Sequence, residues 1–303
     1  MEQRRSGYLG QPVNPALCAE RLRRVPPRIA PHHHCWHSTS AVSIPFNWQS
    51  ATDADVDHQY SPSRHALRPL DEYLAEYHEL SSSHDARALR QPHRPLLIYI
   101  HGGYWQRLSA ADSLFNAVDA IAEGISLHAV EYTLAPYATV PDIIEECITD
   151  VEKTIAELQP THVVLAGCSA GAHLAAMCAR EYAIASKLSG VVLLSGIYDL
   201  RPLVVTETND PLHLTPESAA AISPQLLAPT HGLSQALCAV GESESSEFIR
   251  QNAEYADHLQ ISGTTTETMV VTNRDHFNLP YDLLRRGTLV GDWTLAQLLK
   301  EAS

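Results

Sequence analysis

The chain has 303 residues, of which 45% are hydrophobic and 18% are charged. This length and composition are sufficient for one large hydrophobic core and argue against a disordered chain. Lys and Arg number 21 and Asp and Glu number 35, which gives a formal net charge of −14. Such an acidic chain repels phosphate backbones and anionic lipids, so we expect neither nucleic acid nor a membrane surface as a partner.

The cysteines and the start of the chain bear on its location. No apolar run of signal-peptide length follows the charged Met1–Arg5, and no apolar window is long enough to span a bilayer. The six cysteines are scattered, with no Cys-x-x-Cys pair, which is typical of free thiols in a reducing compartment. We therefore predict a cytoplasmic protein. The cysteines are Cys18, Cys35, Cys147, Cys168, Cys178 and Cys238.

The first 47 residues differ in composition from the rest. They are rich in Arg, Pro and His and show no sustained periodicity, so we predict an irregular N-terminal extension over 1–47 and a folded domain over 48–303. A cluster in the extension could hold a metal ion, but clustered imidazoles alone fix no coordination geometry. A polar tail is the favoured interpretation, and we predict no metal site. The cluster is His32, His33, His34, Cys35 and His37.

Helix and strand patterns then alternate along the chain. Apolar residues at helical spacing run from Leu70 to Leu80, and a polar stretch extends to Arg94. Beyond Pro95, continuous apolar runs typical of buried strands alternate with helical stripes. The sequence therefore predicts an α/β fold with a mostly parallel central sheet and helices on both faces. Strands are expected at 96–100, 125–130, 163–166, 191–194, 236–240 and 268–271, with helices that include 114–121, 143–158 and 170–182.

A Gly-x-Ser-x-Gly pattern lies between the strand 163–166 and the helix 170–182. Its central residue is Ser169, flanked by Gly167 and Gly171. In a sharp strand–turn–helix connection, the small residues let the two elements pass closely and the serine hydroxyl projects from the carboxyl edge of the sheet. This context predicts that Ser169 is a nucleophile.

A glycine-rich turn follows the strand 96–100. In His101-Gly102-Gly103, the residues without side chains let backbone N–H groups point into a cavity. The N–H of Gly102 or Gly103, together with that of Ala170, could bind the oxyanion of a tetrahedral intermediate. An ordinary turn is the alternative, but the position of the motif upstream of the serine favours an oxyanion hole.

A serine nucleophile needs a general base, and in this fold the order along the chain is serine, acid, histidine. His276 follows the strand 268–271 and fits this order. His258 is the rival, but it lies in a helical pattern. His213 and His231 precede the expected acid and break the order.

The acid is expected after the strand 236–240, where three carboxylates compete. Glu244 is favoured because it lies on the turn before the next helix. Glu242 leaves the strand too early, and Glu247 would already be helical. Asp199, after the strand 191–194, remains the alternative acid.

Several segments together resemble the arylformamidases, or kynurenine formamidases, among the α/β-hydrolases. The turn continues as His-Gly-Gly-Tyr-Trp, which matches the HGGxW motif of that family. The resemblance covers roughly Gln59 to Leu284. The further matching segments are Tyr-Ser-Pro-Ser at 60–63, Glu-Tyr-Thr-Leu-Ala-Pro at 131–136, Ser-Gly-Ile-Tyr-Asp-Leu-Arg-Pro-Leu at 195–203 and Ser-Ser-Glu-Phe-Ile-Arg-Gln at 245–251.

The resemblance implies a reaction and roles for residues. That family removes formate from N-formylkynurenine with a Ser-acid-His triad, so Ser169 would be the nucleophile and His276 the base. Glu244 matches the position of the family's Asp, and Asp199 matches an Asp that is usually outside the triad. A small-molecule substrate is then the expected partner, with no cofactor, and a homodimer is the candidate assembly.

Two aromatic residues follow the glycine turn. Tyr104 and Trp105 could form part of the wall that stacks on the aryl ring of such a substrate. They could equally anchor the loop by packing against the core, because large aromatic residues commonly serve burial.

The chain departs from the family pattern at three places. Cys168 precedes the nucleophile where the family commonly has His, and Glu244 stands where the family has Asp. The stretch 81–95 is too short for the strand hairpin that usually precedes the first buried strand, so we expect a trimmed sheet edge. Two alternative functions stay open: a carboxylesterase acting on small acyl esters, and a catalytically silent α/β-hydrolase that serves as a binding protein.

Overall fold

The apolar runs of the sequence form the central sheet of the computed structural model, which describes residues 46–228 and 231–300. In this part of the chain the sheet has six strands in the order β2-β1-β3-β4-β5-β6, and every pairing is parallel. The prediction of a parallel sheet is therefore confirmed. The strands are β1 (Leu96–Ile100), β2 (Ser126–Val130), β3 (Val163–Cys168), β4 (Gly190–Leu194), β5 (Gln235–Gly241) and β6 (Thr265–Val271).

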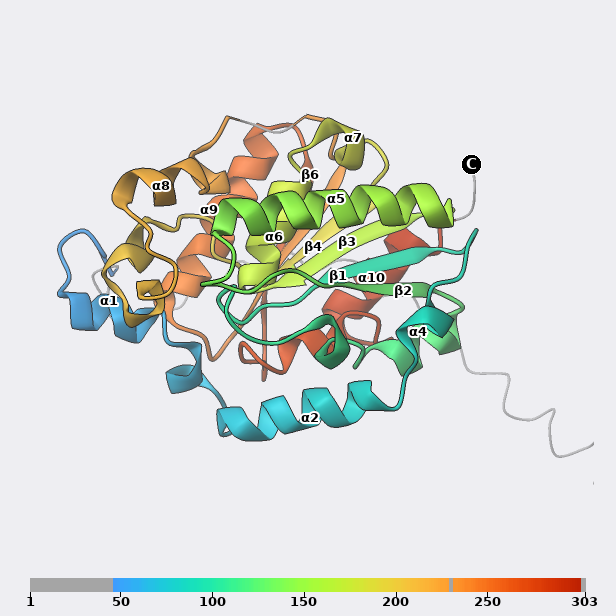
Figure 1. Ribbon diagram of the computed structural model, residues 1–303, viewed down its shortest axis with the longest axis horizontal. Helices are drawn as coiled ribbons and strands as arrows, with labels where there is room; N and C mark the ends of the chain where they lie inside the picture. Colours follow the sequence, from blue (N-terminus) through green and yellow to red (C-terminus); the bar gives the residue numbers. More distant parts are fainter. Residues whose placement is uncertain (1–45, 229–230, 301–303) are drawn as a thin grey trace, which may run out of the picture. The chain divides into compact units, whose positions relative to one another are not determined.

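Successive residues of each strand enter two separate cores, because side chains alternate between the faces of a sheet. Leu96, Ile98 and Ile100 belong to one core, whereas Leu97 and Tyr99 belong to the other. Helices cover both faces, as predicted, and Figure 1 shows α5 and α2 on opposite sides. The first core takes residues of α5 (Val140–Leu158), α6 (Ala170–Cys178) and α9 (Ser246–Ile261), and the second takes residues of α2 (Leu70–Ser82), α4 (Ala117–Glu123) and α10 (Leu289–Leu298).

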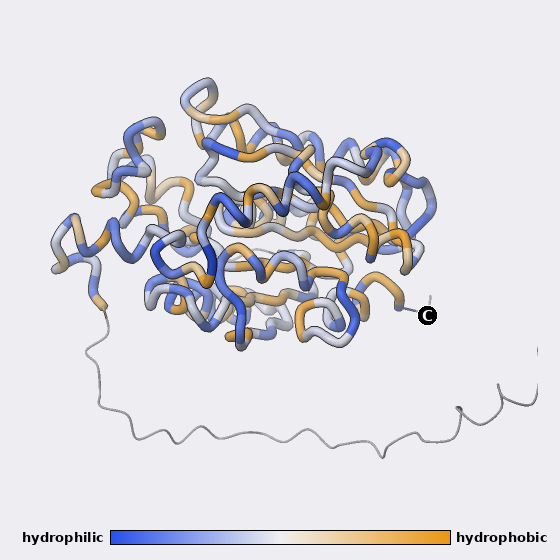
Figure 2. The backbone as a smooth tube through the Cα atoms, turned by 90° about the horizontal axis from the view of Figure 1, so that it is seen from below, coloured by the Kyte–Doolittle hydropathy of each residue, from blue (hydrophilic) through white to orange (hydrophobic). Residues whose placement is uncertain are grey.

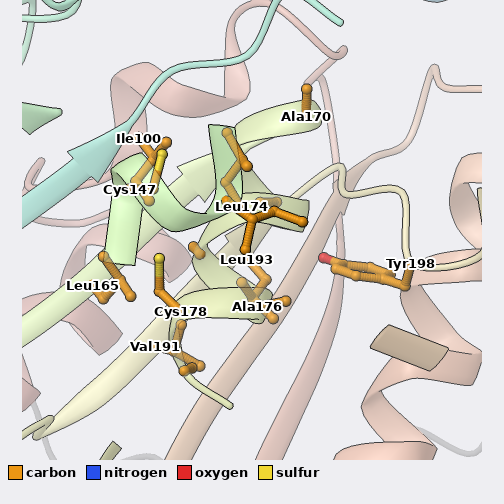
Figure 3. Packing of buried hydrophobic residues seen from close by; sticks show 14 of the residues in the cluster. Ile100, Cys147, Leu165, Ala170, Leu174, Ala176, Cys178, Val191, Leu193 and Tyr198 are labelled. Atoms are coloured by element: carbon orange, nitrogen blue, oxygen red, sulfur yellow. The ribbon is translucent and has the colours of Figure 1, made fainter. Parts of the chain in front are cut away.

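The long helix α5 illustrates how local sequence and burial cooperate. Thr139 accepts a hydrogen bond from the backbone N–H of Asp142, and the side chain of Asp142 accepts one in return, which closes a capping box. A stripe that includes Cys147 is buried against the sheet. Figure 3 shows Cys147 and Cys178 among apolar neighbours such as Leu165, so these two thiols are core residues, as predicted.

Hydrophobic segments lie in the interior of the domain and hydrophilic ones at its outer turns (Figure 2). In the described ranges, no helix is both long and apolar enough to cross a bilayer. The cysteines described there, at 147, 168, 178 and 238, are buried and free. The shorter helices are α1 (Asp53–Gln59), α3 (Ala86–Leu89), α7 (Tyr182–Ala185) and α8 (Pro216–Ala221), with 3-10 turns that include η2 (Pro62–His65), η4 (Arg201–Val205) and η7 (Leu279–Asp282).

Two predicted helices differ in detail from the observed ones. The helix predicted over 170–182 ends at Cys178, and a turn leads into α7, which places Ile184 and Ala185 in the core. The helix predicted around 114–121 forms over Ala117–Glu123, but its Val118 and Ile121 are more than 60% exposed. The residues of this helix that are buried are Ala117 and Ala120.

The stretch 81–95 contains the end of α2 and the short α3, and no strand. The strand β2 therefore forms one edge of the described sheet, which agrees with the expected trimming. The predicted extension over 1–47, with its His32–His37 cluster, lies outside the described residues apart from its last two positions, and it stays a prediction.

Candidate active site

Ser169 lies at the sharp turn between β3 and α6. Its backbone has φ 58° and ψ −123°, a conformation that is strained for a residue with a side chain. A Cβ on Gly171 would lie 2.0 Å from the carbonyl oxygen of Ile100, and one on Gly167 would lie 2.1 Å from that of Gly171. The N–H of Ser169 donates to the carbonyl of Leu194 at 2.9 Å. The two glycines thus allow the close crossing that holds the serine in this turn, as predicted.

The loop after β1 approaches the serine from the other side. A Cβ on Gly102 would lie 2.8 Å from the carbonyl oxygen of Cys168 and 3.1 Å from the Cβ of Ser169. The next residues, Gly103, Tyr104 and Trp105, have φ values of 94°, 53° and 59°. Three consecutive left-handed residues are unusual, and strain of this kind concentrates at functional sites.

Hydrogen bonds hold this loop in place. The carbonyl of Gly103 accepts from the N–H groups of Gln106 at 3.0 Å and Arg107 at 3.1 Å. The carbonyl of Trp105 accepts from the N–H of Ala135 at 2.8 Å, which ties the loop to the 131–136 segment beyond β2. The backbone of the loop is therefore fixed before any ligand binds.

His101 supports the loop from inside the protein. Its ring stacks on Tyr132 with centroids 4.2 Å apart, and the Tyr132 hydroxyl donates to the carbonyl of His101 at 2.9 Å. Burial lowers the pKa of His101 to about 4. The imidazole is thus neutral at pH 7, and its role is to pack under the loop.

His276 and Glu244 form a buried pair at the carboxyl edge of the sheet. The Nδ1 of His276 lies 2.7 Å from Oε2 of Glu244, and their side chains are only 6% and 2% exposed. A carboxylate can only accept, so Nδ1 carries the hydrogen, and in a neutral imidazole Nε2 then has a free lone pair. His276 and Ser169 line the same cavity.

The alternative acid, Asp199, is engaged elsewhere. Both of its carboxylate oxygens accept from the Arg201 guanidinium, at 2.9 and 2.8 Å, and the backbone around it is held by the Gln251 side chain. The structure therefore brings Glu244 to His276 and keeps Asp199 in a separate ion pair. His258, the rival base, lies on α9 and stacks on Tyr255.

The cavity beside Ser169 has a volume of about 620 Å³. Its wall carries six aromatic side chains and the charged side chains of Arg107, Asp112 and Glu207. A cavity of this size accommodates a small molecule with one aromatic ring. The aromatic residues of the wall are Tyr60, Tyr77, Tyr99, Tyr104, Phe115 and Phe277.

Tyr104 and Trp105, the two aromatic residues after the glycine turn, have different environments in the structure. Tyr104 lines the cavity, and its hydroxyl donates to the carbonyl of Tyr60. Trp105 does not line it, because its side chain is 0% exposed and packs edge-on against His173, with centroids 5.2 Å apart. The expectation that Trp105 contacts the substrate is corrected: it anchors the loop in the core.

The sequence did not identify two polar residues of the site, Ser195 and Asp275. Ser195 follows β4 and donates through its hydroxyl to Oε1 of Glu244 at 2.5 Å. Asp275 precedes the histidine and accepts from the hydroxyl of Tyr73 at 2.6 Å and from the N–H of Leu67 at 2.7 Å. Ser195 directly follows the buried strand β4, and Asp275 lies on the loop after β6; this position at the carboxyl ends of strands was the available signal.

Asp275 fixes the histidine loop electrostatically. Burial raises the pKa of its carboxyl group, but the hydrogen bonds from Tyr73 and from backbone N–H groups outweigh burial, and the pKa of Asp275 is lowered overall. Its other oxygen accepts from the N–H groups of Phe277 and Asn278, both at 2.9 Å. The loop that carries His276 is therefore held by a charged residue.

This arrangement agrees with comparisons to known proteins. The α/β-hydrolase fold family matches residues 97–279, which include the serine turn, the glycine loop and the buried pair. A kynurenine formamidase of Salmo salar is 38% identical over 217 residues, covering 68% of this chain and 71% of the relative. A kynurenine formamidase of Danio rerio is 32% identical over 282 residues, covering 80% of this chain and 96% of the relative.

The chain belongs to the kynurenine formamidase family of α/β-hydrolases. Among solved structures, a candidate thioesterase of a Silicibacter species superimposes with a TM-score of 0.70 at 21% identity, covering 78% of this chain and 98% of that one. At this identity the likeness concerns the fold alone, and it confirms the predicted α/β-hydrolase architecture.

Residues 46–228 and 231–300 contain no group of three or more His, Cys, Asp and Glu side chains that could hold a metal ion. Ser169, His276 and the glycine loop line the cavity described above.

Proposed function

We propose that the chain is an arylformamidase that hydrolyses N-formyl-L-kynurenine to L-kynurenine and formate. The observation that carries the proposal is the buried contact between His276 and Glu244 in the cavity that also contains Ser169. The kynurenine formamidase relatives support the choice of a formamide as the substrate. Ser169, Glu244 and His276 are the proposed catalytic triad.

The first half of the proposed reaction forms a formyl-enzyme. The Ser169 hydroxyl attacks the formyl carbon while Nε2 of His276 takes its proton, and Glu244 stabilises the resulting imidazolium. The N–H groups of Gly102 or Gly103 and of Ala170 stabilise the oxyanion. The C–N bond then breaks as His276 returns the proton to the departing aryl nitrogen, so the aryl amine leaves neutral.

The second half regenerates the enzyme. A water molecule gives a proton to His276 and attacks the formyl ester on Ser169, and the same N–H groups bind the second oxyanion. Collapse of this intermediate releases formic acid, which ionises to formate, and His276 returns the proton to the serine oxygen. No redox partner or metal ion enters the balance.

The charges of the cavity wall support a zwitterionic substrate. Kynurenine carries an α-carboxylate and an α-ammonium group besides its aromatic ring. Arg107 lies on the wall and has no ion-pair partner among the described residues, and the Glu207 carboxylate is equally unpaired there. We place the substrate carboxylate at Arg107 and the ammonium at Glu207, with the ring between the aromatic side chains.

The test is the turnover of N-formyl-L-kynurenine by the wild type and by Ser169→Ala. The proposal predicts product with the wild type and a loss of at least about 10³-fold in the variant. Equal rates, or no reaction with either protein, contradict it. Rapid labelling of Ser169 by a fluorophosphonate probe distinguishes an active hydrolase from a catalytically silent binding protein.

The remaining expectations accompany this proposal. A cytoplasmic location, a homodimer and the absence of nucleic-acid and membrane partners stay predictions. Gel filtration coupled to light scattering measures the assembly directly, and fractionation of cells that express the chain measures its location.

A further inference from the structure

Ser195 occupies a conspicuous position behind the proposed triad. It directly follows β4, is 0% exposed, and its backbone has φ 50°, in the left-handed region that non-glycine residues avoid. Its N–H donates to the carbonyl of Ala239 at 2.8 Å, which extends the pairing of β4 with β5 by one residue. A serine is thus held in a strained conformation with its hydroxyl inside the protein.

The hydroxyl of Ser195 meets the carboxylate that contacts the histidine. Its Oγ lies 2.5 Å from Oε1 of Glu244, and the same oxygen accepts from the N–H of Gly241 at 2.7 Å. The other oxygen, Oε2, lies 2.7 Å from Nδ1 of His276. Both oxygens of this buried carboxylate are therefore engaged, and Ser195 supplies the only side-chain hydroxyl among these partners.

We propose that Ser195 is a positioning residue that fixes the Glu244 carboxylate for the reaction. This inference rests on the proposed function, because it assigns a role within the same triad. A glutamate has one more rotatable bond than an aspartate, and this extra freedom lets its carboxylate turn away from His276. The bonds from Ser195 and Gly241 to Oε1 restrict the rotation and leave Oε2 aimed at the imidazole.

Ser195 also links the acid to the nucleophile. The residue before it, Leu194, accepts the hydrogen bond from the N–H of Ser169. The end of β4 therefore holds the backbone of the nucleophile through one residue and the carboxylate of the acid through the next. A shift of this strand end would disturb both groups at once.

The hydroxyl has an electronic effect besides the geometric one. A hydrogen bond to Oε1 spreads the negative charge of the carboxylate away from Oε2. Without this bond, more charge faces the imidazole, which favours the imidazolium form. The loss of this bond is therefore expected to move the acid limb of the kcat/KM–pH profile upward.

A pair of substitutions separates this role from a purely structural one. Ser195→Ala and Ser195→Gly both remove the hydroxyl, but glycine also relieves the left-handed backbone. We expect kcat to fall about 10-fold in both variants with little change in KM, and the acid limb to move up by about 0.5 pH unit. The thermal unfolding midpoint of each variant shows whether it is folded at the assay temperature.

The proposal is overturned if folded Ser195→Gly keeps the wild-type kcat and pH profile. It is also overturned if Ser195→Ala is impaired and Ser195→Gly is not, because backbone strain would then explain the loss. The rate at which a fluorophosphonate labels Ser169 provides a readout that needs no formamide substrate. If the wild type is labelled but cleaves no formamide, the substrate assignment fails while the role of Ser195 is still measured by the labelling rate.

A double-mutant cycle tests the link between the two residues. Glu244→Asp shortens the side chain and withdraws it from both Ser195 and His276. If Ser195 acts through Glu244, adding Ser195→Ala to Glu244→Asp lowers kcat by less than about 2-fold further. A loss that multiplies the two single effects would show that Ser195 acts independently of the carboxylate.

Discussion

The two sides of the cavity are held together by different physical means. The elbow side, residues 96–105 and 163–171, is fixed by backbone contacts so close that a single Cβ would collide with a carbonyl oxygen. The acid–base side, residues 195–199, 241–247 and 273–278, has one such close crossing, where a Cβ on Gly241 would lie 2.5 Å from the carbonyl oxygen of Arg274. Its acid and base, however, are held by hydrogen bonds between buried polar side chains. The comparison teaches that the serine is placed mainly by the shape of the backbone, whereas the acid and the base are placed mainly by polar side chains.

This difference predicts how each side responds to substitution. On the elbow side, adding a methyl group displaces the backbone that places the serine and the oxyanion donors. On the acid–base side, exchanging one polar atom leaves the shape intact and changes the charge or the proton position. The variants below are chosen to test this division, and they are ordered from the largest expected effect to the smallest.

Glu244→Gln is expected to have the largest effect. The amide keeps the size of the side chain but removes the charge that stabilises the imidazolium and holds the hydrogen on Nδ1. We expect kcat to fall about 10³-fold with the fold retained, measured as the hydrolysis rate of N-formylkynurenine beside a circular dichroism spectrum.

Glu242→Gln provides the matched control. Glu242 lies on the same turn, is exposed, and accepts only from the backbone N–H of Asn273 at 3.2 Å. Its activity should match the wild type within about 2-fold. If the two variants lose activity equally, the acid has been assigned to the wrong carboxylate.

Gly102→Ala tests the elbow side. The new Cβ would lie 2.8 Å from the carbonyl oxygen of Cys168, so the oxyanion loop and the serine turn must separate by a few tenths of an ångström. We expect kcat/KM to fall about 10²-fold, because oxyanion donors act only at the correct distance. Steady-state kinetics on a formamide substrate measures the loss.

The control for this variant is Gly287→Ala. Gly287 has φ 80° with nothing within 4 Å of an added Cβ, so the substitution strains the backbone without a collision. It should lower the free energy of unfolding by about 1 kcal/mol and leave kcat/KM unchanged. Wild-type activity in Gly102→Ala would show that the loop accommodates the added Cβ without displacing the oxyanion donors, which contradicts the expected collision.

Arg107→Gln should have a smaller and more selective effect. If the arginine binds the substrate carboxylate, kcat/KM for N-formylkynurenine falls about 10-fold, whereas kcat/KM for formanilide, which has no carboxylate, changes little. Arg87→Gln, an exposed arginine on α3, controls for the loss of one surface charge. Equal losses of kcat/KM on both substrates would show that Arg107 does not bind the substrate carboxylate.

The smallest effect concerns stability and pH. Burial lowers the pKa of His101 and of His173 to about 4, so the unfolded chain binds protons between pH 6.5 and 4 that the folded chain does not. The stability contributed by these neutral imidazoles is therefore lost as pH falls through this window. Each group should lower the free energy of unfolding by about 2 kcal/mol at pH 5 relative to pH 7.

Asp275, on the acid–base side, also loses its contribution to stability as pH falls, but it does so in a lower pH range. Its pKa is lowered in the folded state, so its contribution is complete above the unfolded value of about 3.9 and is lost only as pH falls through the folded value. Chemical denaturation at pH 7, 6 and 5 measures the difference, and His173→Gln should flatten the dependence by about half. A stability that is constant from pH 7 to pH 5 would contradict the buried neutral imidazoles.

The sequence predicted most of the elbow side. Continuous apolar runs at 96–100 and 163–166 mark buried strands, and glycines spaced around Ser169 point to a close crossing of strand and helix. These features are local, because each depends on residues within one strand and the turn that follows it. Trp105 is the exception, since its sequence position does not show which way its ring turns.

The acid–base side was harder to predict because its contacts join distant segments. Ser195 and Glu244 are 49 positions apart, and Asp275 meets Tyr73 across 202 positions. The order of residues along the chain allowed either Glu244 or Asp199 as the acid of the triad. The structure shows that the Asp199 carboxylate instead forms an ion pair with Arg201. Hydrogen-bond partners of this kind depend on how the strand ends meet, which periodicity does not encode.

The most direct test of the central claim compares two substrates of the wild-type enzyme. Measured side by side, kcat/KM for N-formyl-L-kynurenine should exceed kcat/KM for p-nitrophenyl acetate, although the ester is the chemically easier bond to cleave. The reason is that only the formamide substrate carries the carboxylate and ammonium groups that we place at Arg107 and Glu207 of the cavity wall. An ester rate far above the formamide rate would contradict the account and identify a small-acyl carboxylesterase.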